Sequence, residues 1–227
     1  MDTLHHTIQW PCELPTETKD AIVLCAIRAS QFPIAKSEAK SGGVTYLKKG
    51  IIAITFGNEN TNTMNSGIYG EGSWLGSSMI NQSVHLHASI EELEPVEVIY
   101  FPKERIDALA ATDPFVYKWL YHCSVRAQQQ WLFAQITSLH DRQTRVVFTL
   151  LEIARLMKTV KGSFIKVSAS QKQLSAITGI SRPRLNEVLK MLESSGEISI
   201  ERGSIHLIEP SKLQHRLSVL DGTIRLN

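Results

Sequence analysis

The sequence predicts an α+β protein in which an antiparallel β jelly roll is followed by a long helix and a winged helix-turn-helix. Three observations lead to this prediction. Short β-type runs fill residues 20–105, a helical pattern without Gly or Pro covers 115–140, and the last third reads as helix, helix, helix and hairpin. The predicted domains are a barrel over 1–112, a helix over 113–141 and a helix-turn-helix domain over 142–227.

Composition restricts the class of protein. The 227 residues are 43% hydrophobic and 20% charged, as in ordinary globular domains. No run approaches the roughly 18 apolar residues of a membrane span, and the amino terminus has neither the basic start nor the apolar run of a secretory signal. Cys12, Cys25 and Cys123 are odd in number and widely spaced, which favours a reducing compartment over a disulfide framework. We therefore expect a cytoplasmic protein without a membrane partner.

The charge is unevenly distributed along the chain. The net charge is +2, but residues 145–227 hold 13 Lys and Arg against 7 Asp and Glu, a balance of +6. Residues 1–144 hold 11 against 15, a balance of −4. A basic carboxyl-terminal third on an acidic body indicates that this third meets a polyanion.

The predicted barrel rests on turn-bounded β patterns. Residues 44–57 are rich in β-branched side chains around Gly50, and 58–67 form a cluster of turn residues. A glycine-rich stretch follows at 67–78, and then come an alternating run at 84–93 and a strand at 95–102. Short strands at this spacing are typical of a small antiparallel barrel or jelly roll.

The helix over 115–140 should begin at Pro114, with Asp113 as its cap. About 25 helical residues span nearly 40 Å, which is longer than a small barrel needs. We therefore expect it to pair with its copy in a homodimer, while packing on its own barrel remains compatible with this. The apolar or small residues that recur at helical spacing are Val116, Leu120, Cys123, Ala127, Trp131 and Ala134.

A helix over 144–158 precedes the stretch SQKQLSAITGISRPRLNEVLKM, which is cut at Gly179. Ser170 and Gln173 have the spacing of a capping box, and Gly179 suits the left-handed end of a helix. Ser181 should cap the second helix of the pair, and residues 197–209 read as a hairpin. The buried stripe of the second helix is expected to be Leu185, Val188, Leu189 and Leu192.

The exposed sides of that second helix suit DNA. A helix in the major groove presents its amino-terminal residues to base edges. Arg182 can bind guanine, Asn186 can pair with adenine, and Glu187 can accept from cytosine. Ser181 and the free amides of the helix can hold a phosphate. The alternative is an ordinary solvated corner, but the hairpin and the basic charge beside the pair favour binding to double-stranded DNA.

Two stretches carry a family resemblance. QLSAITGISRPRLNEVLKMLESSGEISIERGSIHLIEPSKL (173–213) resembles the winged helix of the cyclic-AMP receptor protein and fumarate-nitrate regulator (CRP/FNR) family. GIYGEGSWLGSS (67–78) resembles the glycine-rich turn of that family's cyclic-nucleotide-binding barrel, and DRQTRVVFTLL (141–151) its entry into the DNA domain. The resemblance implies a bacterial transcription regulator rather than an enzyme. It also implies a dimer on a palindromic site, with RNA polymerase as a partner.

The resemblance assigns DNA contacts by position. Arg182, Pro183 and Glu187 occupy the three places from which the family's cyclic-AMP receptor reads bases with Arg, Glu and Arg. Pro183 cannot donate a hydrogen bond and Glu187 reverses a charge, so we expect a different DNA sequence. The residues expected at base edges are Arg182, Pro183, Asn186 and Glu187. Those expected at phosphates are Ser170, Gln171, Ser181, Arg184, Lys190, Arg202 and Gly203.

The effector pocket that the resemblance implies departs from the family. Cyclic AMP needs a cation for its phosphate, and the sequence has no arginine between residues 29 and 104. We expect no tight cyclic-AMP binding and no cofactor. The barrel would either take an uncharged ligand near Trp74 and Trp131 or act as a ligand-free scaffold, and Cys12 and Cys25 do not supply an iron-sulfur cluster. The corresponding pocket positions are Gly76, Ser77, His87, Gln130 and Trp131.

A different function is suggested by HLHASIE. His85 and His87 would share one face of a strand, and with Glu91 they resemble the metal motif of cupin enzymes. A metal-dependent enzyme, or a metal or haem sensor, is therefore the alternative. The cupin pattern lacks its later glycine, whose place Val98 takes, and surface or packing histidines are the simpler interpretation. We expect no metal site.

Overall fold

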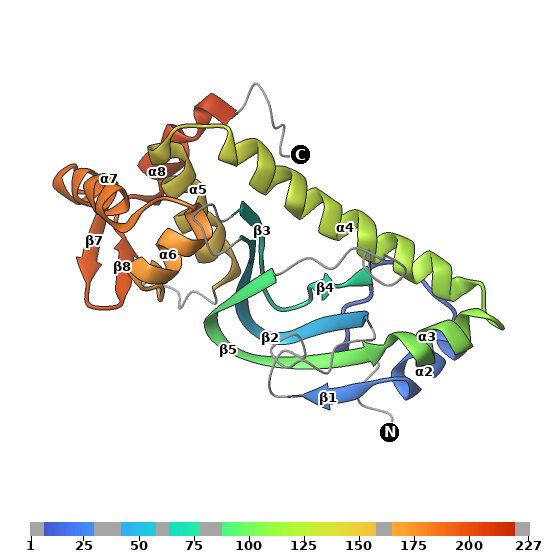
Figure 1. Ribbon diagram of the computed structural model, residues 1–227. Helices are drawn as coiled ribbons and strands as arrows, with labels where there is room; N and C mark the ends of the chain where they lie inside the picture. The colour runs from blue at the N-terminus through green and yellow to red at the C-terminus, as the bar shows by residue number, and fades with distance from the viewer. Residues whose placement is uncertain (1–6, 30–41, 58–63, 78–87, 158–164, 221–227) are drawn as a thin grey trace. The chain divides into compact units, whose positions relative to one another are not determined.

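The computed structural model describes residues 7–29, 42–57, 64–77, 88–157 and 165–220. The chain forms two compact units, and the strands β2 (Gly43–Phe56) and β5 (Ala88–Pro102) and the helix α4 (Phe115–Ser138) contribute to both (Figure 1). The first unit comprises 1–50, 70–85 and 95–129, and the second comprises 51–69, 86–94 and 130–227.

An antiparallel sheet forms the barrel region, as predicted. Its strand order is β1-β5-β2-β3, with β4 paired to β2. The turn cluster expected over 58–67 is wrong at its end, because β3 begins at Met64 and pairs with the end of β2. The break expected at Glu94 is also wrong, since β5 runs through Pro95 without interruption. The remaining strands are β1 (Ile27–Ala29), β3 (Met64–Tyr69) and β4 (Trp74–Leu75).

Gly50 lets the two long strands approach closely. Its φ is +92°, and a Cβ there would lie 2.4 Å from the carbonyl oxygen of Pro95 in β5. An L side chain would therefore be strained and would also clash with backbone. The glycine that interrupts the apolar run of β2 is thus required by packing between strands.

The first unit has an aromatic core. Tyr46, Trp74, Phe101 and Trp119 are all buried. The ring of Trp74 lies 4.8 Å from that of Tyr46 and 5.3 Å from that of Trp119, centroid to centroid. The Trp74 indole donates to the carbonyl of Gln9 at 2.9 Å, so the amino-terminal segment packs on the same core. Protein side chains therefore fill the space around Trp74. Two helices that the sequence did not reveal, α2 (Thr16–Leu24) and α3 (Lys103–Ala110), belong to this unit.

The long helix begins where the Asp113-Pro114 pattern predicts. The carboxylate of Asp113 accepts from the amide of Phe115 at 2.9 Å and from the hydroxyl of Thr18 at 2.6 Å. Val116 and Cys123 are fully buried in the core of the first unit. No helix in the described part of the chain has the length and apolar character to cross a bilayer.

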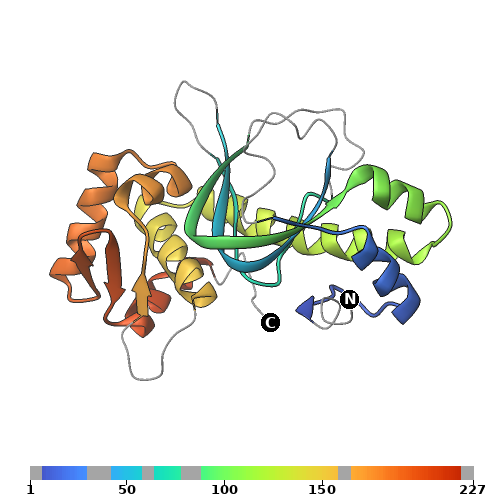
Figure 2. The ribbon, with the colours of Figure 1, turned by 90° about the horizontal axis from the view of Figure 1, so that it is seen from below.

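The second unit contains the predicted helix-turn-helix and hairpin. Three strands pair in the order β6-β8-β7, visible in Figure 2 as the red hairpin beside an orange strand. Val146, Leu150, Leu174, Leu185 and Leu189 form the centre of its apolar core. The helices are α5 (Arg142–Leu156), α6 (Gln171–Thr178), α7 (Arg182–Ser194), α8 (Pro210–Arg216) and the short η3 (Ser218–Leu220). The strands are β6 (Ile165–Val167), β7 (Ile198–Glu201) and β8 (Ser204–Leu207), of which β6, like α8, was not expected.

Candidate nucleic-acid interface

The start and end of α6 have the predicted geometry. The Ser170 hydroxyl accepts from the Gln173 amide at 3.2 Å, and the Gln173 side chain accepts from the Ser170 amide at 3.0 Å, which completes a capping box. Gly179 ends α6 in the left-handed conformation with φ +63°. Ile180 is buried immediately after it. This tight turn fixes where α7 begins.

The first turn of α7 is open. Ser181 occupies the cap position, but the expected cap is wrong in detail, because its hydroxyl makes no capping hydrogen bond in the described structure. Pro183 lies in the first turn and has no amide hydrogen. The amides of Arg182 and Arg184 therefore keep free hydrogens at the positive end of the helix dipole. Such a helix start can accept an anion.

The side chains of α7 separate into an inner and an outer face. Leu185, Leu189 and Leu192 are buried, as predicted, whereas Val188 is only half-buried. Asn186 is half-buried at the edge of the outer face. The exposed residues on the outer face are Ser181, Arg182, Pro183, Arg184, Glu187 and Lys190. The structure thus brings the predicted base-reading residues together, while their contacts with bases remain a prediction.

The cations of this outer face form no ion pair in the described part of the chain. Among the described residues, none bonds or forms an ion pair with the side chains of Arg182, Arg184 or Lys190. Their positive field is therefore directed to solvent rather than cancelled locally.

The start of α6 precedes α7 in the chain and the hairpin follows it, and both carry residues that were predicted to bind phosphates. The turn between β7 and β8 consists of Arg202 and Gly203, both exposed, and Gly203 has φ +82°. Ser170 and Gln171 are half-buried at the start of α6. The exposed members of the predicted phosphate-binding set are thus available, and their role stays a prediction.

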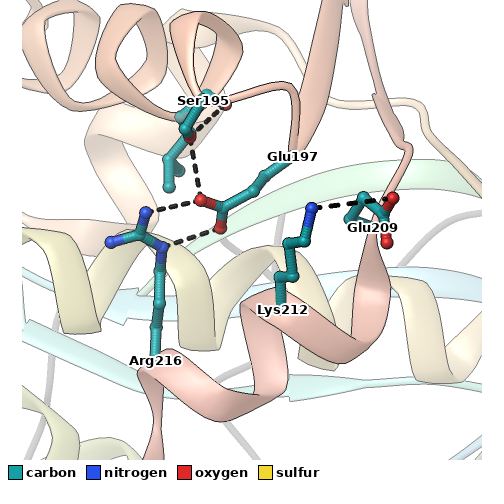
Figure 3. A network of polar contacts seen from close by, with 6 residues as sticks. Ser195, Glu197, Glu209, Lys212 and Arg216 are labelled. Carbon is teal, nitrogen blue, oxygen red and sulfur yellow. Dashed lines mark hydrogen bonds and ion pairs between the residues drawn. The ribbon is translucent and has the colours of Figure 1, made fainter.

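A buried carboxylate supports the hairpin. The side chain of Glu197 is only 4% exposed, and Arg216 of α8 binds it through two nitrogens, with Nε to Oε2 at 2.7 Å (Figure 3). The Ser195 hydroxyl donates to the same carboxylate at 2.8 Å. The hydrogen bonds from Arg216 hold the pKa of Glu197 below its usual value, and they raise the pKa of Arg216 in turn.

The backbone of Glu197 connects the same elements. Its amide donates to the carbonyl of Leu192 in α7 at 3.1 Å. Its carbonyl accepts from the amides of Ile208 and Glu209 at 2.9 and 3.1 Å, just after β8. Glu197 therefore joins the end of α7, the hairpin and α8. The sequence did not predict the pair of Glu197 and Arg216. The available signal was that Glu197 directly precedes an apolar strand, because an acid buried there needs a cation as its partner.

Two of the positions expected at an effector pocket, Gly76 and Ser77, have structural roles in the first unit. Gly76 has φ +87°, and a Cβ there would lie 2.4 Å from the carbonyl oxygen of Gly43. Ser77 is buried and accepts from the Ser124 hydroxyl at 3.1 Å. His87 lies outside the described residues. Gln130 is half-buried and Trp131 is exposed, and both belong to the other compact unit.

The alternative metal site gains no support. His85 and His87 lie outside the described residues, and Glu91 is half-buried on β5. Within the ranges that the structure describes, no group of three His, Cys, Asp or Glu residues could hold a metal ion.

Known proteins resemble the chain in both sequence and fold. Residues 144–216 match the Crp-like helix-turn-helix domain family. The fold is similar to a transcriptional regulator assigned to the Crp/Fnr family from Eubacterium rectale, with a TM-score of 0.72, 15% identity, and coverage of 90% of this chain and 95% of that chain. It is also similar to the c-di-GMP-responsive global regulator CLP of Xanthomonas campestris, with a TM-score of 0.70, 18% identity and coverage of 85% and 99%. No curated protein matches the chain by sequence.

Proposed function

We propose that this chain, which belongs to the CRP/FNR family of transcription regulators, binds a palindromic site on double-stranded DNA as a homodimer. The observation that carries the proposal is the start of α7. There Arg182 and Arg184 are exposed and have no acidic partner among the described residues, and the free amides of the first turn lie beside them. A helix start of this kind enters the major groove and meets base edges and phosphates together.

The base-reading residues predicted on α7 have distinct roles in this proposal. Arg182 binds guanine, Asn186 pairs with adenine, and Glu187 accepts from cytosine. Pro183 offers only an apolar contact. Phosphates are held by Ser170, Gln171, Ser181, Arg184, Lys190, Arg202 and Gly203.

The dimer contact is proposed on the exposed apolar side of α4. Val116 and Cys123 are fully buried in the chain's own core, and Trp131 is the one residue of the expected stripe that is exposed. Large apolar side chains that are more than 40% exposed on one helix indicate a surface that is covered by a partner. The exposed residues that share this side are Tyr117 (61%), Tyr121 (65%), Trp131 (42%) and Leu132 (48%).

We further propose that the barrel does not respond to cyclic AMP. The aromatic rings around Trp74 fill the core of the first unit, and the sequence places no arginine between residues 29 and 104. The regulator would act in the cytoplasm, with RNA polymerase as its partner. Calorimetry with cyclic AMP tests the first point, and micromolar affinity would refute it.

Selection of bound DNA from a random pool tests the main proposal. With the full-length protein we expect an inverted repeat whose half-sites lie about 10–11 base pairs apart, centre to centre. Mapping of bound DNA in cells should return the same sequence. Enrichment of a single half-site, or of no sequence, would contradict the proposal.

A pair of variants tests the dimer separately. Tyr121→Glu with Leu132→Glu should give a monomer in sedimentation and lose the preference for the inverted repeat, because charges would enter the apolar contact. Gln214→Glu is the control, since Gln214 is an exposed polar residue of α8 and does not belong to the long helix. A dimer that survives the double substitution would place the contact elsewhere.

A further inference from the structure

A cavity lies within the second unit, away from the outer face of α7. It has a volume of about 400 Å³ and lies where β3, the end of α4, the start of α5 and the end of α6 meet. This volume is within the range of sites that hold small molecules. Its lining includes Asn65, Gln135, Arg145, Thr149, Thr178 and Gly179.

Most hydrogen-bond donors of the lining are already used by the protein. The hydroxyls of Thr137, Ser138 and Thr178 donate to carbonyls of their own helices, at 2.7, 2.6 and 2.7 Å. The side-chain amide of Gln135 donates to the carbonyl of Asn65 at 3.0 Å. The three hydroxyls have no further hydrogen to donate to an occupant, whereas the Gln135 amide uses one of its two N–H donors in the wall of the cavity.

Two donors on α5 remain available. Arg145 and Thr149 are four residues apart and share one face of the helix. The guanidinium of Arg145 has five N–H donors, and the structure shows one hydrogen bond, to the carbonyl of Thr178. Thr149 is buried, and its hydroxyl has no partner in the described part of the chain. An occupant with acceptor oxygens would satisfy both.

Arg145 also has no counter-ion among the residues that the structure describes. No carboxylate occurs among the described residues that line the cavity. Arg155 and Arg216 are each paired with an acid, Glu152 and Glu197 respectively. Burial lowers the pKa of Arg145, and no acid opposes this effect. Binding of the Thr178 carbonyl uses a donor but leaves the charge unneutralised, and a partly desolvated cation favours an anion.

We infer that this cavity binds a small anion with a phosphate or carboxylate group, whose oxygens accept from Arg145 and Thr149. The site is separate from the barrel core and from the proposed base-reading residues. An occupant lies against Gly179, which ends α6 and precedes α7, so it contacts the turn that positions the DNA-reading helix.

Calorimetry on the full-length protein without DNA tests the site. Inorganic phosphate is injected into the protein solution, and sodium chloride at the same ionic strength is injected as the blank. Acetate serves as the carboxylate probe. We expect one site per chain with a dissociation constant of about 1 mM or tighter for phosphate. Arg145→Gln should weaken binding at least about tenfold, because the charge-assisted hydrogen bonds are lost. Arg142→Gln is the control, since Arg142 is exposed on the same helix and does not line the cavity.

A second variant separates binding from folding, because Arg145→Gln also removes the donor to Thr178. Thr149→Val keeps the shape of the side chain and leaves the bond from Arg145 to Thr178 in place. It should weaken phosphate binding about threefold to tenfold with an unchanged unfolding midpoint. Absence of saturable binding in the wild type, or equal affinity in both variants and the wild type, would overturn the inference.

A phosphate of the DNA backbone is the other possible occupant of the cavity. If free phosphate does not bind but Thr149→Val and Arg145→Gln reduce the salt dependence of DNA binding by about one phosphate, the cavity receives the DNA backbone. That result would also overturn the inference, while leaving the proposed DNA-binding function intact.

Discussion

Two regions of the second unit use basic side chains in opposite ways. In α8, Arg216 is only 29% exposed and binds the buried carboxylate of Glu197 through two nitrogens. At the start of α7, Arg182 and Arg184 are exposed and have no acidic partner among the residues that the structure describes. The first region joins α8 to the residue that precedes the hairpin, and the second is the surface proposed to meet DNA.

The difference shows what a charge can do in each place. A cation held by a buried acid has its field cancelled, and it contributes to the geometry and stability of the fold. A cation without an acid contributes little to stability, but its field attracts phosphates and responds to salt. Residues 145–227 have an excess of six positive charges, but those cations that are paired with a buried acid do not attract DNA. Substitutions in the two regions should affect different measurements.

The largest expected effect is on stability at the paired site. Arg216→Met leaves the carboxylate of Glu197 buried with Ser195 as its remaining side-chain partner, and we expect a loss of about 3 kcal/mol in the free energy of unfolding. Unfolding in urea measures it. Lys212→Met is the matched control, because the side chain of Lys212 is 63% exposed and its Nζ lies 3.8 Å from Glu209, so the loss should stay below about 0.5 kcal/mol. Equal losses in the two variants would show that the buried pair is no stronger than a surface pair.

The next effect is on DNA recognition at the unpaired site. Arg182→Ala should weaken binding to the selected DNA site by about 1–3 kcal/mol and relax the preference at one base pair. The unfolding free energy should change by less than about 0.5 kcal/mol, because the side chain is exposed and unpaired in the described structure. Binding to a panel of single-base variants of the site measures both affinity and preference. A uniform loss on all sequences would assign Arg182 to phosphate instead of a base.

This comparison also shows which features a sequence can predict. The capping box of Ser170 and Gln173 and the left-handed Gly179 follow from local preferences, so they were predictable. The pair of Glu197 and Arg216 is 19 residues apart and depends on how α8 packs, which no local pattern encodes. The same holds for the long helix, since periodicity finds an apolar stripe but does not say what covers it.

The barrel strands teach a related lesson. The sequence predicts a run ending at 93 and a separate strand beginning at Pro95, yet β5 continues through Pro95. The role of Gly50, which was expected inside its strand, appears only when β2 and β5 are paired, because a Cβ at Gly50 would lie 2.4 Å from the carbonyl oxygen of Pro95. The local preference of proline for strand ends and turns was therefore misleading here, because the pairing of a long strand is not encoded locally.

An effect of pH should distinguish the two regions as well. The pKa of Glu197 is lower in the folded protein than in the unfolded chain, because Arg216 and Ser195 donate to the ionised form. Its contribution to stability is therefore complete above the unfolded pKa and is lost as pH falls through the lowered folded value. Unfolding free energies between about pH 7 and pH 3 should show this acid loss in the wild type and a smaller one in Glu197→Gln. Identical profiles would mean that the carboxylate charge contributes nothing.

The smallest effect concerns salt. Lys190→Ala should weaken DNA binding similarly for all sequences and reduce the slope of log affinity against log salt by about 0.9, because one phosphate contact is lost. Lys212→Ala is the matched control, since Lys212 also belongs to the second unit but pairs with Glu209. Titrations at several salt concentrations should leave its slope unchanged. If both lysines lowered the slope equally, pairing with an acid would not determine which cations meet DNA, and the distinction between the two regions would fail.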